Sequence, residues 1–97
     1  MDDEKLDKET KYLFGTPEGF SEYLSDVLKG NDYSEVKDAL SRAVVCKGIS
    51  DIAQKGIVSR VSLYRSYVAG TNEPSLQSFL AVLSALGVEL EVVPQVQ

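Results

Sequence analysis

The segment GIVSRVSLYRSYVAG, residues 56–70, places two arginines among apolar residues in an otherwise acidic protein. On a helical wheel, at about 100° per residue, one side of this segment carries Leu63, Ser66 and Tyr67. The opposite side carries Val61, Tyr64, Arg65 and Val68, with Arg60 and Ser62 at its borders. This pattern is typical either of an ordinary helix with a solvated charged face or of a helix that reads DNA.

A second short helix is predicted immediately before this segment. Residues 50–56 follow a helical pattern with Ser50 as the expected cap, and Ser59 is the expected cap of the helix over 60–68. Two short helices joined by a tight turn and flanked by longer apolar helices have the spacing of a helix-turn-helix. The sequence therefore favours a DNA-binding unit centred on residues 50–68.

The side chains of this unit suit the chemistry of DNA recognition. An arginine can donate two hydrogen bonds to guanine, and a valine can pack against a thymine methyl group. Serine hydroxyls and a helix N-terminus can donate to phosphates. We therefore expect DNA to be contacted by Ser50, Ser59, Arg60, Val61, Ser62, Tyr64 and Arg65.

The flanking sequence predicts an all-α domain. Thr16-Pro17-Glu18 begins a helix that Gly30 ends, and Asp32 begins another that runs to Gly48. Ser75 begins the last helix, which Gly87 ends, and its core stripe is predicted to be Leu76, Phe79, Leu80, Leu83 and Leu86. Residues 1–15 lack a clean period and are predicted to form an acidic arm.

VELEVV, residues 88–93, alternates apolar and acidic residues before Pro94 and is predicted to be a short strand over 88–94. A lone strand leaves its own backbone groups unpaired, so pairing with the same strand of a second subunit is one solution. Val88, Leu90 and Val92 would then share a dimer interface. The alternative is an extended tail packed on the helices.

Composition limits the classes of function. The chain has 97 residues, of which 43% are hydrophobic and 26% charged, as expected of one small folded domain. It has no apolar run long enough to span a membrane, and its acidic start is unlike a secretory signal. It has no histidine and no phosphate-binding glycine motif. We expect a cytoplasmic protein that is not an enzyme and needs no cofactor or metal, with its one cysteine, Cys46, filling the core.

Charge is distributed unevenly along the chain. The net charge is −5, but residues 1–38 hold 11 acids against 5 bases, a net charge of −6. Residues 42–65 hold 5 bases against one acid, a net charge of +4. An acidic front joined to a basic middle is consistent with two different partners.

A family resemblance covers nearly the whole chain. SDIA (50–53), SRVSLYR (59–65) and NEPSLQSFLAVLSALG (72–87) resemble the prophage and addiction-module antidote proteins of the HigA-like antitoxin group. PEGFSEYLSDVLKGND (17–32) is similar to the helix that this group places before its DNA-binding unit. The resemblance implies a five-helix domain of the lambda-repressor-like helix-turn-helix class. It also implies a dimer that binds operator DNA, represses its own operon and neutralises a RelE-like toxin.

Two positions depart from the pattern of this group. Its turn glycine usually stands where this chain has Ile57, one residue after Gly56. Asp51 stands where related proteins more often carry a neutral polar residue near the phosphate. An aspartate there would repel a phosphate, or it would stabilise the start of its own helix.

The implied toxin partner gives the acidic front a possible role. A toxin that acts on ribosomes needs a basic surface, and Tyr12, Leu13 and Phe14 would supply an apolar anchor within the acidic front. Two alternatives stay open. One is a protein-binding module that masks a basic partner without significant DNA binding, and the other is a stand-alone prophage regulator.

Overall fold

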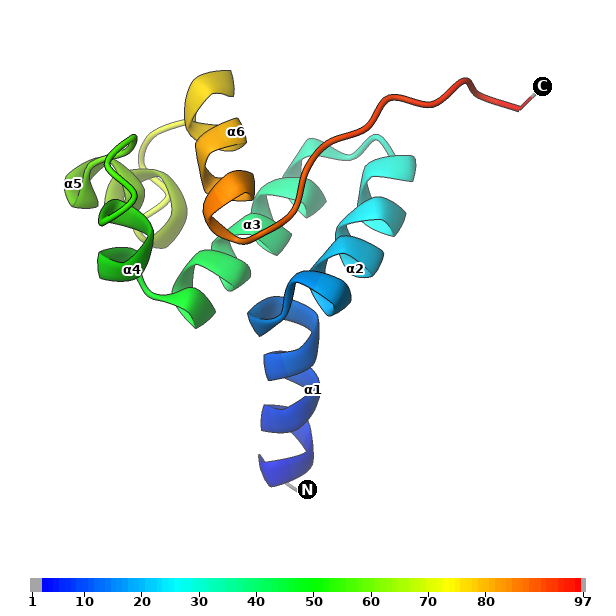
Figure 1. Ribbon diagram of the computed structural model, residues 1–97, viewed down its shortest axis with the longest axis horizontal. Helices are drawn as coiled ribbons and strands as arrows, with labels where there is room; N and C mark the ends of the chain where they lie inside the picture. Colours follow the sequence, from blue (N-terminus) through cyan, green and yellow to red (C-terminus); the bar gives the residue numbers. More distant parts are fainter. Residues whose placement is uncertain (1–2, 97) are drawn as a thin grey trace.

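The computed structural model describes the backbone of residues 3–96 and the side chains of residues 8–96. Over that range the chain forms six α-helices, a single π-helical turn and no strand (Figure 1). The elements are α1 (Asp3–Gly15), α2 (Pro17–Lys29), α3 (Tyr33–Lys47), α4 (Ile49–Ala53), α5 (Arg60–Leu63), η1 (Tyr64–Val68) and α6 (Leu76–Ala85). The prediction of an all-α protein is confirmed, although there is one more α-helix than the five that the resemblance implied.

Helix α3 lies at the centre of the fold. One face of it carries Ala39, Leu40, Ala43 and Val44, which are all 2% exposed or less. Small side chains on this face allow neighbouring helices to approach closely, and α1, α2, α4 and η1 all contact α3. The remaining core residues are Phe14, Phe20, Leu24, Ile52, Leu63, Tyr67, Val82, Leu83 and Leu86.

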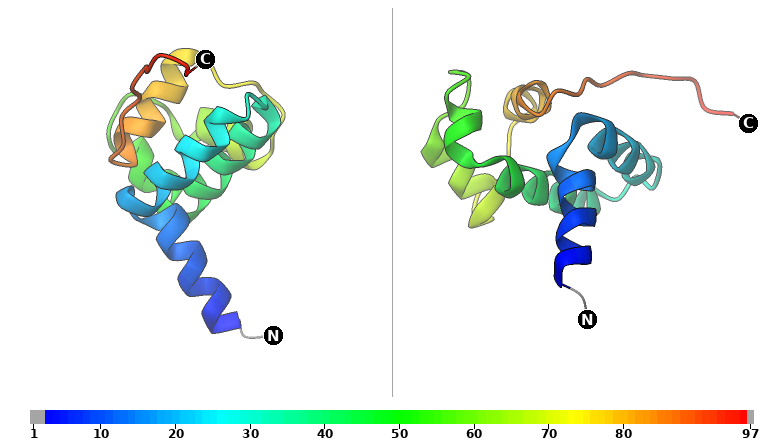
Figure 2. Two further views of the ribbon diagram at one scale, coloured as in Figure 1. Left: turned by 90° about the vertical axis from the view of Figure 1, so that its right-hand side faces the viewer. Right: turned by 60° about the horizontal axis from the view of Figure 1, so that its bottom comes forward.

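The predicted acidic arm over residues 1–15 was wrong, because the described part of this segment is helical from Asp3. Thr16 joins α1 to α2: its hydroxyl donates to the Tyr12 carbonyl at 2.8 Å and accepts from the Gly19 amide at 3.0 Å. Gly19 lies so close to α1 that a Cβ atom there would be 2.0 Å from the Tyr12 oxygen. The first turns of α1 nevertheless project beyond the body of the protein (Figure 2).

The burial of Phe14 explains how α1 is held without a clear apolar period. The Phe14 side chain is 5% exposed, and its ring lies 5.2 Å from that of Tyr23 and 6.5 Å from that of Phe20. The Arg42 guanidinium lies 5.8 Å from the centre of the Phe14 ring and is paired with Asp38 at 3.1 Å. The Phe14 ring therefore attaches the end of α1 to the core.

The predicted strand over residues 88–94 does not form in this chain. After Gly87, which adopts a φ of +82°, residues 88–96 run in an extended course away from the helices (Figures 1 and 2). Within residues 3–96 there is no second strand to pair with the backbone of this segment, and a strand exists only as part of a ladder. Val88 is still attached to the body, through a hydrogen bond of 3.0 Å from its amide to the Leu83 carbonyl.

Two predictions of burial were also wrong. Leu76 and Leu80 of α6 are 71% and 48% exposed, because the helix turns Val82, Leu83 and Leu86 into the core instead. Cys46 is exposed rather than a core filler, because the buried face of α3 ends at Val44. The exposure of Leu76 and Leu80 leaves an apolar surface of α6 open to solvent.

Candidate nucleic-acid interface

Helices α4 and α5–η1 follow one another across a tight turn and contact each other, at the place where the sequence predicted two short helices. The second helix is continuous from Arg60 to Val68, although its last five residues have π-helical hydrogen bonding. Its inward side chains are those expected from the wheel: Leu63, Ser66 and Tyr67 are 0%, 6% and 3% exposed. The opposite side, the outward stripe, consists of Val61, Tyr64, Arg65 and Val68 and is exposed throughout.

The turn between the two helices depends on Gly56, which adopts a φ of +86°. Asn31 is the one non-glycine residue with positive φ among those described, so Ile57 needs no strained conformation. Gly56, one position before the glycine of the pattern that the chain resembles, therefore supplies the positive φ of this turn. The Ser59 side chain then accepts a hydrogen bond from the Ser62 amide at 3.1 Å and begins the second helix, as predicted.

The predicted cap at Ser50 was wrong. Helix α4 begins one residue earlier, at Ile49, with Gly48 in the capping position and no side-chain cap. Ser50 is therefore an exposed residue of the first turn, beside Asp51. Its hydroxyl is not used as a cap, so it is free to face a ligand at this end of α4.

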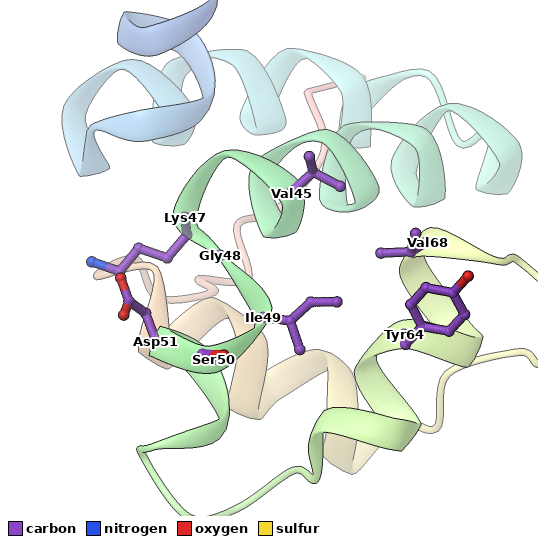
Figure 3. Close-up of a pocket in the computed structure, with 8 residues that line it drawn as sticks. All are labelled: Val45, Lys47, Gly48, Ile49, Ser50, Asp51, Tyr64 and Val68. Atoms are coloured by element: carbon purple, nitrogen blue, oxygen red, sulfur yellow. The ribbon is translucent and has the colours of Figure 1, made fainter.

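Two shallow grooves bring the predicted DNA-contacting residues together. One, of about 420 Å³, is lined by Ile49, Arg60, Val61, Tyr64 and Arg65. The other, of about 390 Å³, shares Ile49 and Tyr64 and continues to Val45, Lys47, Gly48, Ser50, Asp51 and Val68 (Figure 3). Ser59 and Ser62 line neither groove, although both are exposed on the same helix.

Sequence reasoning missed the apolar wall that α3 and α4 contribute. Figure 3 shows Val45 and Ile49 pointing toward the same space as Tyr64 and Val68 of the outward stripe. Val45 is 62% exposed, although the next residue on one side of it, Val44, is fully buried. Val45 and Ile49 give no signal in a one-dimensional pattern, because they become neighbours of Tyr64 and Val68 only when α3 and α4 fold against η1.

The end of the second helix is held by its own following loop. The Arg65 carbonyl accepts hydrogen bonds from the Thr71 amide at 2.9 Å and from the Asn72 amide at 3.3 Å. The wide π-helical turn is closed by the Ala69 amide, which donates to the Tyr64 carbonyl at 2.8 Å. The backbone of Arg65 is therefore fixed while its side chain stays exposed, as a residue that reads a partner requires.

Glu73 attaches the same loop to α3. Its carboxylate accepts a hydrogen bond from the Tyr33 hydroxyl and pairs with the Lys37 ammonium at 3.1 Å. The hydrogen bond to Glu73 raises the pKa of Tyr33 to about 12, with burial adding to the shift. The same contacts, from Tyr33 first and then from Lys37, hold the pKa of Glu73 below its ordinary value.

Comparison with known proteins identifies the family. The family model described as probable addiction module antidote protein matches residues 4–94, which is nearly the whole chain. The chain belongs to this family. No curated protein and no solved structure matches the chain. Membership supports an antitoxin role for the chain and implies a toxin partner of some kind.

The residues predicted to bind the toxin of this antidote differ in their exposure. Tyr12 is 48% exposed and Leu13 is half-buried, whereas Phe14 lies in the core. Phe14 is therefore not available as a surface anchor, which corrects that part of the prediction. Binding of a toxin by Tyr12 and Leu13 stays a prediction.

The residues predicted to form the antidote's dimer interface also differ. Val88 is half-buried against the core, whereas Leu90 and Val92 are 41% and 94% exposed. The structure thus leaves two of the three apolar side chains of the segment uncovered.

Within residues 3–96 no helix is both long and apolar enough to cross a membrane.

Proposed function

We propose that this antidote protein is a sequence-specific DNA-binding repressor of its own operon, acting as a homodimer in the cytoplasm, and that it is not an enzyme. The observation that carries DNA binding is the outward stripe. Arg65 stands on it with Arg60 at its border, on an exposed helix face whose backbone is fixed at both ends. An exposed arginine side chain on a fixed backbone can donate to both acceptors of a guanine in the major groove.

The local charge supports a nucleic acid as the partner of this face. Residues 52–72 include Lys55, Arg60 and Arg65 and none of the 15 acidic residues of the chain. Asp51 lies at the far end of the adjoining groove, near Lys47 (Figure 3). A cationic face on a protein of net charge −5 favours specific over indiscriminate binding, because the rest of the surface repels DNA.

Selection from a random oligonucleotide pool, followed by titration at several salt concentrations, tests this function. We expect enrichment of a palindromic sequence and a shallow salt dependence, because few cations face the DNA. If no sequence is enriched, the proposal of sequence-specific DNA binding is wrong. The alternative, a protein-binding module, then becomes the better description.

We further propose that the toxin partner is RelE-like, as the resemblance to HigA-like antitoxins implies, and that the acidic front meets its basic surface. Glu18, Glu22 and Asp26 on α2 are exposed, as is Tyr12 at the end of α1. Opposite charge at a protein interface mainly speeds association, and an apolar anchor slows dissociation.

The toxin interface cannot be tested by removing residues 1–30, because Phe14, Phe20 and Leu24 belong to the core. The better test is a full-length variant in which Glu18, Glu22 and Asp26 are changed to lysine, co-expressed with the toxin encoded beside it. We expect weaker co-purification and unchanged operator binding. Unchanged co-purification would place neutralisation on another surface, and a neighbouring gene without a toxin would favour a stand-alone prophage regulator.

The homodimer is supported by a second exposed surface. No charged residue occurs between Pro74 and Val88, and within this segment α6 exposes Leu76 and Leu80. The extended segment after it exposes Leu90 and Val92 beside unpaired backbone groups. A second copy would cover both features at once by pairing the segments as strands and packing the helices.

A further inference from the structure

The outward stripe has a composition that solubility does not explain. Val61, Tyr64 and Val68 are 58%, 53% and 44% exposed, and they recur at the spacing of one helix face. The core uses the other face of the same helix, so these side chains contribute little to folding. An exposed helix face normally carries charged or polar residues, and three exposed apolar residues in line indicate contact with a partner.

The stripe is also continuous with apolar side chains from other helices. Ile49 of α4 lines both grooves together with Tyr64, and Val45 of α3 extends the second groove beyond Val68. Figure 3 shows these four side chains converging on one space. The apolar surface is thus a hollow with walls from three elements, and Arg60 and Arg65 line one of its two grooves.

The charge around this hollow indicates which partner enters it. The two grooves are lined by three cations, Lys47, Arg60 and Arg65, and by one acid, Asp51. This excess of positive charge favours a polyanion over a protein with a mixed surface. In the major groove of DNA the one apolar group presented by a base edge is the C5-methyl group of thymine. A methylated cytosine places the same group at the same position.

We propose that the outward stripe reads the C5-methyl groups of pyrimidines, with Val61 contacting the methyl of a thymine close to the guanine bound by Arg65. Val61 and Arg65 lie four residues apart on one helix face, a separation of about 6 Å along its axis. Base pairs are stacked at about 3.4 Å, so the two contacts fall one or two base pairs apart. This inference rests on the proposed DNA binding and adds the chemical group that is recognised.

The test removes the methyl group without changing any hydrogen bond. In the sequence selected by the wild-type protein, each thymine near the conserved guanine is replaced by uracil, which lacks only the C5-methyl. We expect one position at which the affinity falls about fourfold, the factor expected for one buried methyl group. At that position, 5-methylcytosine should bind more tightly than cytosine by a similar factor.

Matched variants assign the contact to a residue. Val61→Ala should abolish the difference between thymine and uracil, whereas Ile57→Ala should preserve it. Ile57 is a suitable control because it is 60% exposed and lies in the turn before the helix, outside both grooves.

The outcomes separate the inference from the function on which it rests. If a sequence is selected but thymine and uracil bind equally at every position, methyl reading is wrong and DNA binding stands. A thymine preference that survives in Val61→Ala, or that 5-methylcytosine does not reproduce, also overturns the assignment. If no sequence is selected at all, both the proposed function and this inference fail.

Discussion

Two surfaces of this antidote protein expose apolar side chains, and they differ in charge. The outward stripe of α5–η1 has arginines within and beside it, and no acid occurs from residue 52 to residue 72. The α6 surface, with Leu76 and Leu80, belongs to a segment with no charge of either sign. Apolar groups mixed with cations suit the major groove of DNA, whereas an uncharged apolar face suits a second copy of the chain. The comparison predicts that variants on each surface affect one partner and spare the other.

A variant that disrupts the core should lose DNA binding and dimerisation together. It is therefore the reference for variants that change only one surface. Gly19→Ala would place a Cβ atom 2.0 Å from the Tyr12 carbonyl oxygen, so α1 and α2 must move apart. We expect a loss of about 3 kcal/mol in the free energy of unfolding, as overpacking typically costs. Chemical denaturation measures it. Gly30→Ala is the control, since a Cβ atom there would have no contact closer than 3.4 Å. Equal stability of both variants would contradict the observed helix contact.

Charge on the α6 surface should break the dimer and leave the fold intact. Replacing Leu76 and Leu80 by glutamate removes two apolar side chains from the proposed interface, a loss of about 3 kcal/mol in dimerisation free energy. Sedimentation should show a monomer with an unchanged helical circular dichroism spectrum. Removal of residues 90–97 tests the tail separately, because Val88 and its hydrogen bond to Leu83 remain. A dimer that survives both changes would place the interface elsewhere.

Loss of Arg65 should affect only DNA. We expect Arg65→Ala to weaken operator binding by about 1–3 kcal/mol and to relax the preference at one base pair. Arg65→Lys keeps the charge and loses the two parallel hydrogen bonds, so it should recover affinity but not the base preference. Fluorescence anisotropy with operator variants measures both. If Arg65→Ala also dissociates the dimer, the two surfaces are not independent.

Removal of the Asp51 charge should have a smaller effect of opposite sign. Asp51 is exposed in the first turn of α4, where a phosphate would approach the groove. Asp51→Asn should tighten operator binding by about 0.5 kcal/mol, most visibly at low salt. An unchanged affinity would mean that Asp51 acts only on the dipole of its own helix.

The smallest effect is expected at Glu73, in the loop that connects the two surfaces. The contacts with Tyr33 and Lys37 lower the pKa of Glu73 below its ordinary value of 4.5. A carboxylate with a lowered pKa stabilises the folded state above its ordinary pKa, and this contribution disappears as the pH falls through the lowered value. The melting temperature of Glu73→Gln should therefore lie slightly below that of the wild type at pH 7, and the two should converge in acid. A constant difference would show that the charge is not responsible.

The helix-turn-helix unit was predictable because its information is local. Ser59 and Ser75 are caps within three residues of the amides they accept from, and Leu63, Ser66 and Tyr67 follow the helical period. The caps at Thr16 and Asp32 were predicted for the same reason. At Ser50 the prediction was wrong because the helix begins one residue earlier, a shift that no local pattern reveals.

The ends of the chain were less predictable, because packing at a distance determines them. The amino acid order alone places Val61, Tyr64 and Arg65 on one helix face, since helical periodicity depends only on spacing. It does not show that Phe14 enters the core against Phe20 and Tyr23, because that depends on how closely α1 approaches α2 at Gly19. Nor does it show which side of α6 is covered, because a helix with apolar residues on several sides has more than one face to bury. The tertiary structure makes that choice, turning Val82 inward and leaving Leu76 and Leu80 exposed.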